Sequence, residues 1–132
     1  MKSVDEQIKD VLQNKVYNVQ ANLVRETAMR VLGNLTKTTP VDTGRARANW
    51  NMSVGTPDMS TTENTGAPDS DATADEVLSG YQGNKAVYVS NGLPYIIRLN
   101  EGHSKQAPAN FVEESVMLAK RQAEAAAKRG LK

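Results

Sequence analysis

The sequence predicts an α+β fold with a helix at each end and a small antiparallel sheet between them. Three observations lead to it. Apolar residues recur every three or four positions near the N-terminus, two short β-rich segments lie in the middle, and a second helical stripe follows Pro108. Runs of strands and helices that do not alternate regularly are typical of this class. We expect residues 1–132 to form one domain, because this length supports a single modest core.

The first element expected is a helix over about residues 3–36, which would be roughly 50 Å long. Ser3 and Glu6 match a capping box at its start. Pro40 limits its end, because the residue before a proline is pushed out of the helical region. The helix is longer than a domain of this size needs, so we expect it to pack on its own sheet and partly on a neighbouring subunit; a coiled coil is the other option. The stripe contains Val4, Ile8, Val11, Leu12, Val16, Val19, Leu23, Ala28, Val31, Leu32 and Leu35.

The sheet is expected within about residues 45–92. A turn precedes it, in which Asp42 can bond backbone N–H groups and Gly44 can supply a positive φ. Polar and apolar residues alternate over 45–54, which predicts a strand with Trp50 and Met52 facing inward. The β-rich residues 85–90 predict the second strand.

A long polar loop is predicted between the two strands, over about residues 56–72. It is rich in Thr, Ser, Asp, Pro and Gly, and no Lys or Arg occurs between Arg47 and Lys85. Such a loop is either a disordered surface segment or an arm that becomes ordered on assembly, and the composition fits both. A short helix is expected over 74–81, with Thr73 as its N-cap.

The last third of the chain predicts two helices joined by a polar loop. The apolar residues 95–100 are expected to form a short helix or a strand, with the helix favoured, and Gly102 allows the chain to turn sharply after them. Pro108 suits the first turn of the C-terminal helix, expected over about 108–129 and packed with the short helix on one face. The loop over 103–107 is therefore fixed at both ends and can present polar side chains to a partner.

Composition excludes several classes of function. The formal net charge of +1 gives no electrostatic case for nucleic-acid binding as the main activity. Because there is no cysteine, disulfides, thiolate metal sites and a Cys nucleophile are excluded. No run approaches the ~20 apolar residues of a membrane span. The start of the chain lacks an apolar signal-peptide core, so we expect synthesis in the cytoplasm.

No set of residues predicts catalysis, a cofactor or a metal site. His103 is the single histidine, and only Glu101 lies near it as a further metal ligand. A triad of Ser104, His103 and Asp42 can be written down, but neighbours on one loop do not face each other productively. Arg45 and Arg47 are expected on a solvated strand face or, alternatively, as guanidinium groups aimed at a partner's carboxylates or at DNA.

Two stretches resemble a known protein family. They are Thr39–Trp50, with the sequence TPVDTGRARANW, and 88–109, which begins YVSNGLPY and continues through EGHSKQAPA. Both are similar in order and spacing to the neck or tail-completion proteins of long-tailed double-stranded DNA phages, a group that includes minor tail protein Z and related tail components. The family often has Glu, an aromatic residue and Gly before the polar loop, whereas this chain has Asn100-Glu101-Gly102.

The resemblance implies a non-enzymatic virion protein made in the host bacterial cytoplasm. It would form a homo-oligomeric ring at the top of the tail tube, with a hexamer favoured over a dodecamer, and join the tail to the head connector. Its partners would be a tail terminator or tail-tube protein, a head connector or stopper protein, and genomic DNA that passes through the lumen without sequence-specific binding; no membrane is involved. A tail terminator or a head-side stopper of the same neck is the alternative. An alternative of another class is a small nucleic-acid-binding or nucleic-acid-modifying protein, supported only if Arg45, Arg47, His103 and Lys105 converge.

The predicted subunit or partner contact combines the two stretches. Its residues are polar, charged or positioned to turn the chain, which suits a wet interface. They are Asp42, Arg45, Arg47, Tyr95, Arg98, Glu101, Gly102, His103, Ser104 and Lys105.

Overall fold

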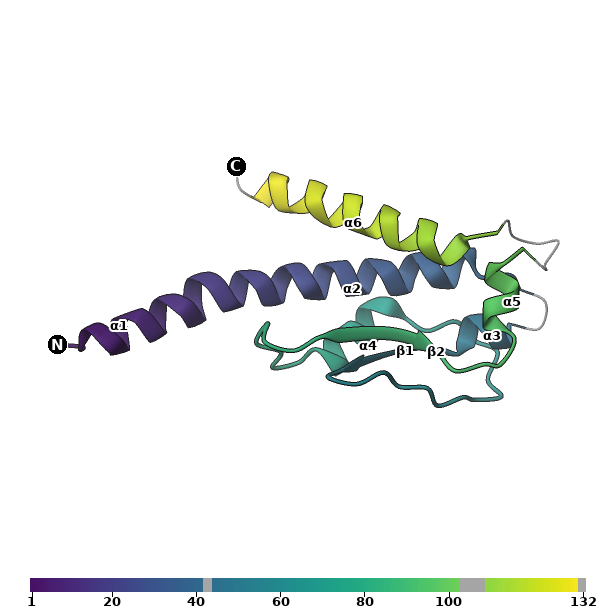
Figure 1. The fold of residues 1–132 in the computed structure, drawn as a ribbon, viewed down its shortest axis with the longest axis horizontal. Coiled ribbons are helices and arrows are strands. Elements are labelled where there is room, and N and C mark those ends of the chain that lie inside the picture. Colours follow the sequence, from purple (N-terminus) through teal and green to yellow (C-terminus); the bar gives the residue numbers. More distant parts are fainter. Residues whose placement is uncertain (42–43, 103–108, 131–132) are drawn as a thin grey trace.

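The computed structural model describes residues 1–41, 44–102 and 109–130. It confirms the α+β class: a long N-terminal helix, a two-stranded antiparallel sheet, short helices, and a C-terminal helix that packs against the long one (Figure 1). The elements are α1 (Val4–Val11), η1 (Leu12–Tyr17), α2 (Asn18–Thr38), α3 (Arg45–Ala48), β1 (Trp50–Val54), α4 (Ser70–Val77), β2 (Val87–Asn91), α5 (Ile96–Asn100) and α6 (Phe111–Gly130).

The long helix is built from α1, η1 and α2, which run end to end (Figure 1). Its start is as predicted, since the Glu6 N–H donates to Ser3 Oγ at 3.1 Å. It ends at Thr38, two residues later than predicted, where Thr39 is extended before Pro40. The sequence did not predict η1, a π-helical segment. A π segment widens the turn and so rotates one half of a helix relative to the other.

The sheet pairs β1 with β2, in a register that runs from Trp50 opposite Asn91 to Val54 opposite Val87. Trp50 and Met52 are buried, as their alternation predicted. The Trp50 indole N–H donates to Thr39 Oγ1 at 2.8 Å and so ties β1 to the end of α2. The buried polar end of the tryptophan is therefore satisfied within the core.

The strand predicted from Arg45 is wrong over its first five residues: Arg45–Ala48 form the helix α3, and Asn49 caps its end. Gly44 precedes it with φ 84°. The Ala48 N–H donates to the Gly44 carbonyl at 3.0 Å, and the Asn49 side chain donates to the Arg45 carbonyl at 2.8 Å. Arg and Ala are strong helix formers, and a four-residue alternation is too short to outweigh that preference.

The loop between the strands is irregular from residue 55 to Asp69, and the last residues of the predicted range belong to α4. Side chains of the chain itself contact the loop, and the choice between a disordered segment and an arm that becomes ordered on assembly stays a prediction. The Asn49 side chain accepts from the Thr62 N–H at 2.7 Å and donates to the Thr62 carbonyl at 3.0 Å. Asn51 donates to the carbonyls of Asp58 and Ser60 at 3.1 and 2.9 Å.

The helix α4 begins four residues earlier than predicted and ends at Val77. Asp69, not Thr73, is its N-cap: the Ala72 N–H donates to Asp69 Oδ1 at 3.1 Å. Asp and Thr are both good N-caps, so composition alone did not separate the two positions.

The long helix lies between the two layers of the fold. The sheet and α4 lie on one side of α2, and α6 lies along its other side (Figure 1). Asn34 and Thr38 of α2 reach across to Ser115 of α6, at 3.2 and 2.8 Å. The core between these layers is mostly aliphatic, with Leu32, Leu35 and Leu78 at its centre, and Trp50 and Phe111 are its aromatic members. Among the helices described, none is both long enough and apolar enough to cross a membrane.

Candidate functional site

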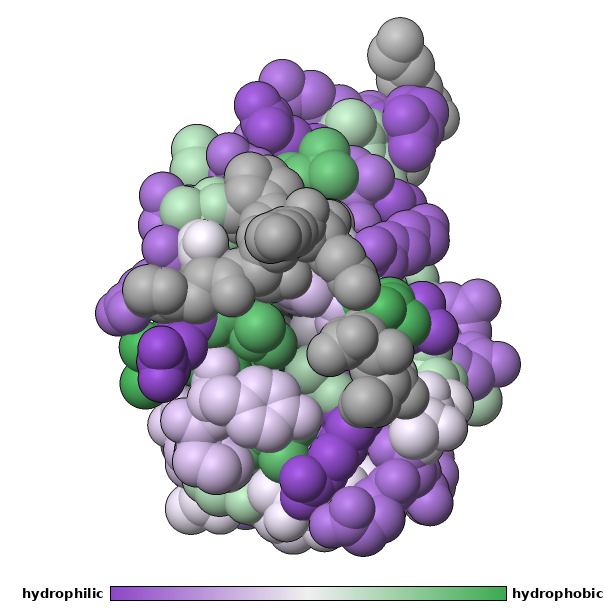
Figure 2. Space-filling view, turned by 90° about the vertical axis from the view of Figure 1, so that its right-hand side faces the viewer, coloured by the Kyte–Doolittle hydropathy of each residue, from purple (hydrophilic) through white to green (hydrophobic). Residues whose placement is uncertain are grey.

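The described residues of the predicted contact lie at the end of the molecule that carries α3 and α5 (Figure 1). Figure 2 looks onto this end, where hydrophilic and hydrophobic residues are interspersed. Four of the predicted residues, Asp42, His103, Ser104 and Lys105, lie outside the described residues, so the site is built from the other six.

The helix α5 carries the exposed part of the site. Arg98 and Glu101 are exposed, on the helix and in the turn after it. Tyr95 is half-buried and packs against the core, so its ring anchors the start of α5. Gly102 has φ 93°, and a Cβ there would lie 3.2 Å from Ala109 Cβ. A glycine is therefore needed at 102 for two reasons: the positive φ of the turn and the close approach of Ala109.

Asn100 joins the two sides of this turn, and the sequence did not predict it. Its side-chain oxygen accepts from the Val112 N–H at 2.9 Å, and its amide donates to both carboxylate oxygens of Glu113 at 3.0 and 2.9 Å. Its carbonyl accepts from the Asn110 N–H at 2.6 Å. Asn100 thereby caps the start of α6 from outside the helix. The one sequence feature that pointed to it was the departure from the family pattern at this position.

The arginines of α3 do not form the row expected of a strand. Residues two apart share one face of a strand, but on a helix they point in nearly opposite directions. Arg45 forms an ion pair with Glu63 at 3.1 Å, and its Nε donates to the Thr62 carbonyl at 3.3 Å. Arg47 is half-buried, and its Nε has no acceptor among the described residues. Arg45 therefore holds the chain's own loop.

The described parts of the two stretches that carry the resemblance are joined to each other. Within them, β1 begins at Trp50 and pairs with β2. The buried Asn91 side chain donates to the Ala46 carbonyl at 2.9 Å and accepts from the Leu93 N–H at 3.1 Å. Asn91 therefore ties α3 to the start of the segment that leads into α5. The sequence showed it only as part of an Asn-Gly turn.

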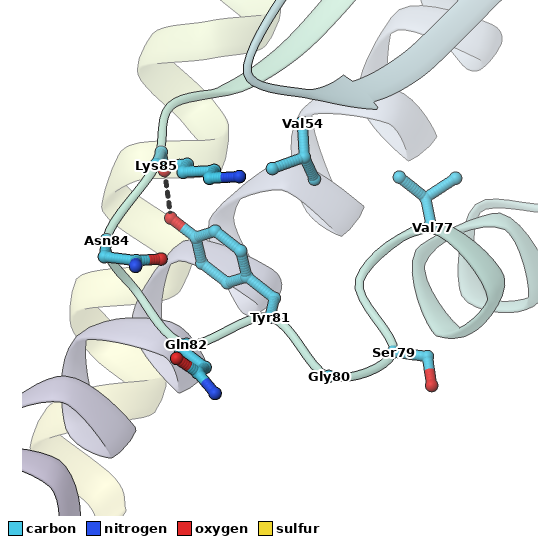
Figure 3. Close-up of a pocket in the computed structure, with 8 residues that line it drawn as sticks. All are labelled: Val54, Val77, Ser79, Gly80, Tyr81, Gln82, Asn84 and Lys85. Atoms are coloured by element: carbon cyan, nitrogen blue, oxygen red, sulfur yellow. Dashed lines mark hydrogen bonds between the residues drawn. The ribbon is translucent and has the colours of Figure 1, made fainter.

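A polar hollow lies elsewhere, beside the connection from α4 to β2 (Figure 3). The Tyr81 hydroxyl donates to the Lys85 carbonyl across the loop, while Val54 and Val77 close its apolar side (Figure 3). No carboxylate is among the residues that line it. Within residues 1–41, 44–102 and 109–130, no three or more His, Asp or Glu side chains are grouped to hold a metal ion.

Comparison with known proteins gives no relative: no family model matches the chain, and no significant match is found among curated proteins or solved structures.

Proposed function

We propose that this protein is a structural virion component of a tailed phage. It forms a ring at the neck, at the top of the tail tube, completes the tail and joins it to the head connector. DNA passes through the lumen without sequence-specific binding. The resemblance of residues 39–50 and 88–109 to neck and tail-completion proteins is the basis of this proposal.

One structural observation carries the proposal furthest. The two similar stretches are separated by nearly forty residues, yet β1–β2 pairing and the Asn91–Ala46 hydrogen bond bring them to one end of the molecule. If this end of the molecule is the contact surface that a family shares, the two similar stretches should lie together there and expose a short helix such as α5. The resemblance therefore coincides with a physical part of the structure.

A second observation supports assembly in general. The N-terminal part of the long helix exposes apolar side chains; Val4 is 70% and Val11 55% exposed. Large exposed apolar stripes on helices mark interaction surfaces more often than they mark free monomers. A subunit whose surface is completed by neighbours would have this property.

The small nucleic-acid-modifying enzyme receives no such support. It requires Arg45 to converge with Arg47, His103 and Lys105, whereas Arg45 pairs with Glu63 of its own loop. A tail terminator or a head-side stopper of the same neck stays the closest alternative, because both would use a similar ring contact.

The test is charge reversal on the exposed part of the site. Arg98→Glu and Glu101→Lys are each expected to leave the isolated protein folded, because an exposed charge contributes only ~0–1 kcal/mol to stability. Like charges placed in an interface cost several kcal/mol, and a ring repeats that cost in every subunit. A phage that lacks the gene, complemented with either variant, should therefore yield heads and tails that are not joined, as seen by electron microscopy.

Arg121→Glu is the matched control, since Arg121 is also an exposed arginine on a helix but lies on α6. It should restore joined virions. Joined virions from both site variants, in amounts equal to the control, would remove this end of the molecule from the interface.

A further inference from the structure

The N-terminal part of the long helix, α1 and η1, projects from the rest of the fold (Figure 1). No residue of α1 or η1 is buried. Its apolar side chains continue without a break onto the start of α2. The exposed members are Val4 at 70%, Ile8 at 52%, Val11 at 55%, Leu12 at 38%, Val16 at 39%, Val19 at 62% and Leu23 at 46%.

The middle of this exposed segment is poor in charge. Between Asp10 and Arg25, Lys15 is the single charged residue, and the polar positions are mostly Asn and Gln. Helices that stay in water usually carry charged residues around their polar face. Interface cores, in contrast, are depleted of charge. The composition of residues 11–24 is therefore that of a covered surface.

The same helix contributes an apolar groove further along. Leu23, Val24, Thr27 and Val31 of α2 form one wall of it. The opposite walls are Val87 and Val89 of β2 and Val116 of α6. The groove is open, so a helix with an apolar face could lie in it.

The exposed apolar residues of α1 and the groove residues of α2 are separated by the same intervals when one helix is read in the reverse direction. The stripe positions 4, 8, 11 and 12 are separated by four, three and one residues. The groove positions 31, 27, 24 and 23, taken in the opposite direction, are separated by the same intervals. We propose that the long helices of two copies pair antiparallel about a two-fold axis between Tyr17 and Asn18, so that α1 of each copy lies in the groove of the other.

The charges at the two ends of the segment fit this direction. In the antiparallel pair, Lys9 of one copy lies at the level of Glu26 of the other, and Asp5 lies at the level of Arg30. Glu26 and Arg30 form an ion pair with each other within α2 at 2.6 Å, so Asp5 and Lys9 of the partner copy would extend that pair. Opposite charges at one level favour this orientation, whereas a parallel pair would place each residue beside its own copy.

This pairing is a property of the free protein and does not depend on the neck assignment. It uses residues 4–31 of the long helix and the groove beside β2 and α6, while the predicted ring contact lies at the end of the molecule that carries α3 and α5 (Figure 1). A two-fold contact uses the same patch on both subunits and closes on itself. Failure of one proposal therefore leaves the other standing.

The first test compares two identical substitutions at exposed isoleucines. Ile8 is 52% exposed on α1, and Ile97 is 67% exposed on α5, outside the proposed contact. Light scattering of the wild-type protein should give twice the 14.3 kDa chain mass. Ile8→Glu should give a single-chain mass with an unchanged circular dichroism spectrum, and Ile97→Glu should stay dimeric. A wild-type monomer, or a dimer that Ile8→Glu does not weaken at least about tenfold in dissociation constant, would overturn the proposal.

The second test determines the direction of pairing. The chain contains no cysteine, so a single introduced thiol reports one position. Val16 lies close to the proposed axis, and Val16→Cys should form an intermolecular disulfide under mild oxidation. Val4 lies about 40 Å from its counterpart in the antiparallel pair at 1.5 Å per residue, so Val4→Cys should stay reduced. Equal cross-linking of both variants would indicate a parallel pair and contradict the proposed arrangement.

Discussion

Asparagine side chains join segments of this fold that helices and strands do not connect. Asn49 holds both backbone groups of Thr62, Asn91 links β2 to α3, and Asn100 links the two sides of the turn before α6. An amide can donate and accept at once, so one side chain satisfies backbone groups that regular structure leaves unpaired. The sequence shows these residues but not their distant partners, which is why none of them could be predicted.

Asp58 and Ser60 offer a test at the level of single atoms. The Ser60 hydroxyl donates to Asp58 Oδ1 at 2.6 Å, and the Ser60 N–H donates to the same oxygen at 3.0 Å. These bonds, the side-chain bond first, lower the pKa of the Asp58 carboxyl from its ordinary value. Their stabilisation is complete above the ordinary aspartate pKa and is lost as the pH falls through the lowered folded value. Ser60→Ala should therefore raise the Asp58 pKa, measured by carboxyl carbon NMR.

Ser53→Ala is the control for this titration. Ser53 also donates to a carbonyl of the loop, that of Thr56 at 2.6 Å, but does not contact Asp58. An Asp58 midpoint that is the same in the wild type, Ser60→Ala and Ser53→Ala would contradict the assignment.

At the scale of elements, the sequence predicted helices and strands correctly where the hydrophobic pattern extends over many residues. The long helix, the inward Trp50 and Met52, and the short helix α5 follow from periodicity and local preference. The errors fall on short elements: α3 was taken for a strand, and α4 was assigned the wrong cap. The π segment η1 could not be predicted, because its hydrogen bonds shift by one residue without changing the composition. The conformation of such short segments depends on their tertiary contacts, which the sequence does not show.

The loop between the strands gives a prediction at this scale. Asn49 is 1% exposed and bonds to the Thr62 N–H. Asn49→Ala removes the acceptor of the half-buried Thr62 N–H, while Arg45 still donates to the Thr62 carbonyl, so the free energy of unfolding should fall by about 1 kcal/mol. Hydrogen exchange of the Thr62 amide should also become faster in the native state.

Asn51→Ala is the comparison for the loop. Asn51 binds carbonyls of the loop but no loop amide, so exchange at Thr62 should stay close to that of the wild type. Slow exchange at Thr62 in Asn49→Ala would show that the loop is held by other contacts.

At the scale of the whole molecule, the structure has two surfaces at opposite ends. One end carries α3, α5 and the turn at Asn100; the other carries the exposed helical residues 4–24, of which 11–24 are poor in charge. The sequence predicted the first surface through resemblance alone, since no reactive group marks it. It predicted the second only as an excess of helix length, because a groove made by three elements has no local pattern.

The proposed joining of heads to tails by this protein can be tested by deleting its gene. Electron microscopy of particles from a phage that lacks the gene should show DNA-filled heads and complete tails that are not attached to each other. The purified protein added to that lysate should restore joined particles. Normal virions without the gene, or an absence of heads or of tails, would contradict a role at the neck.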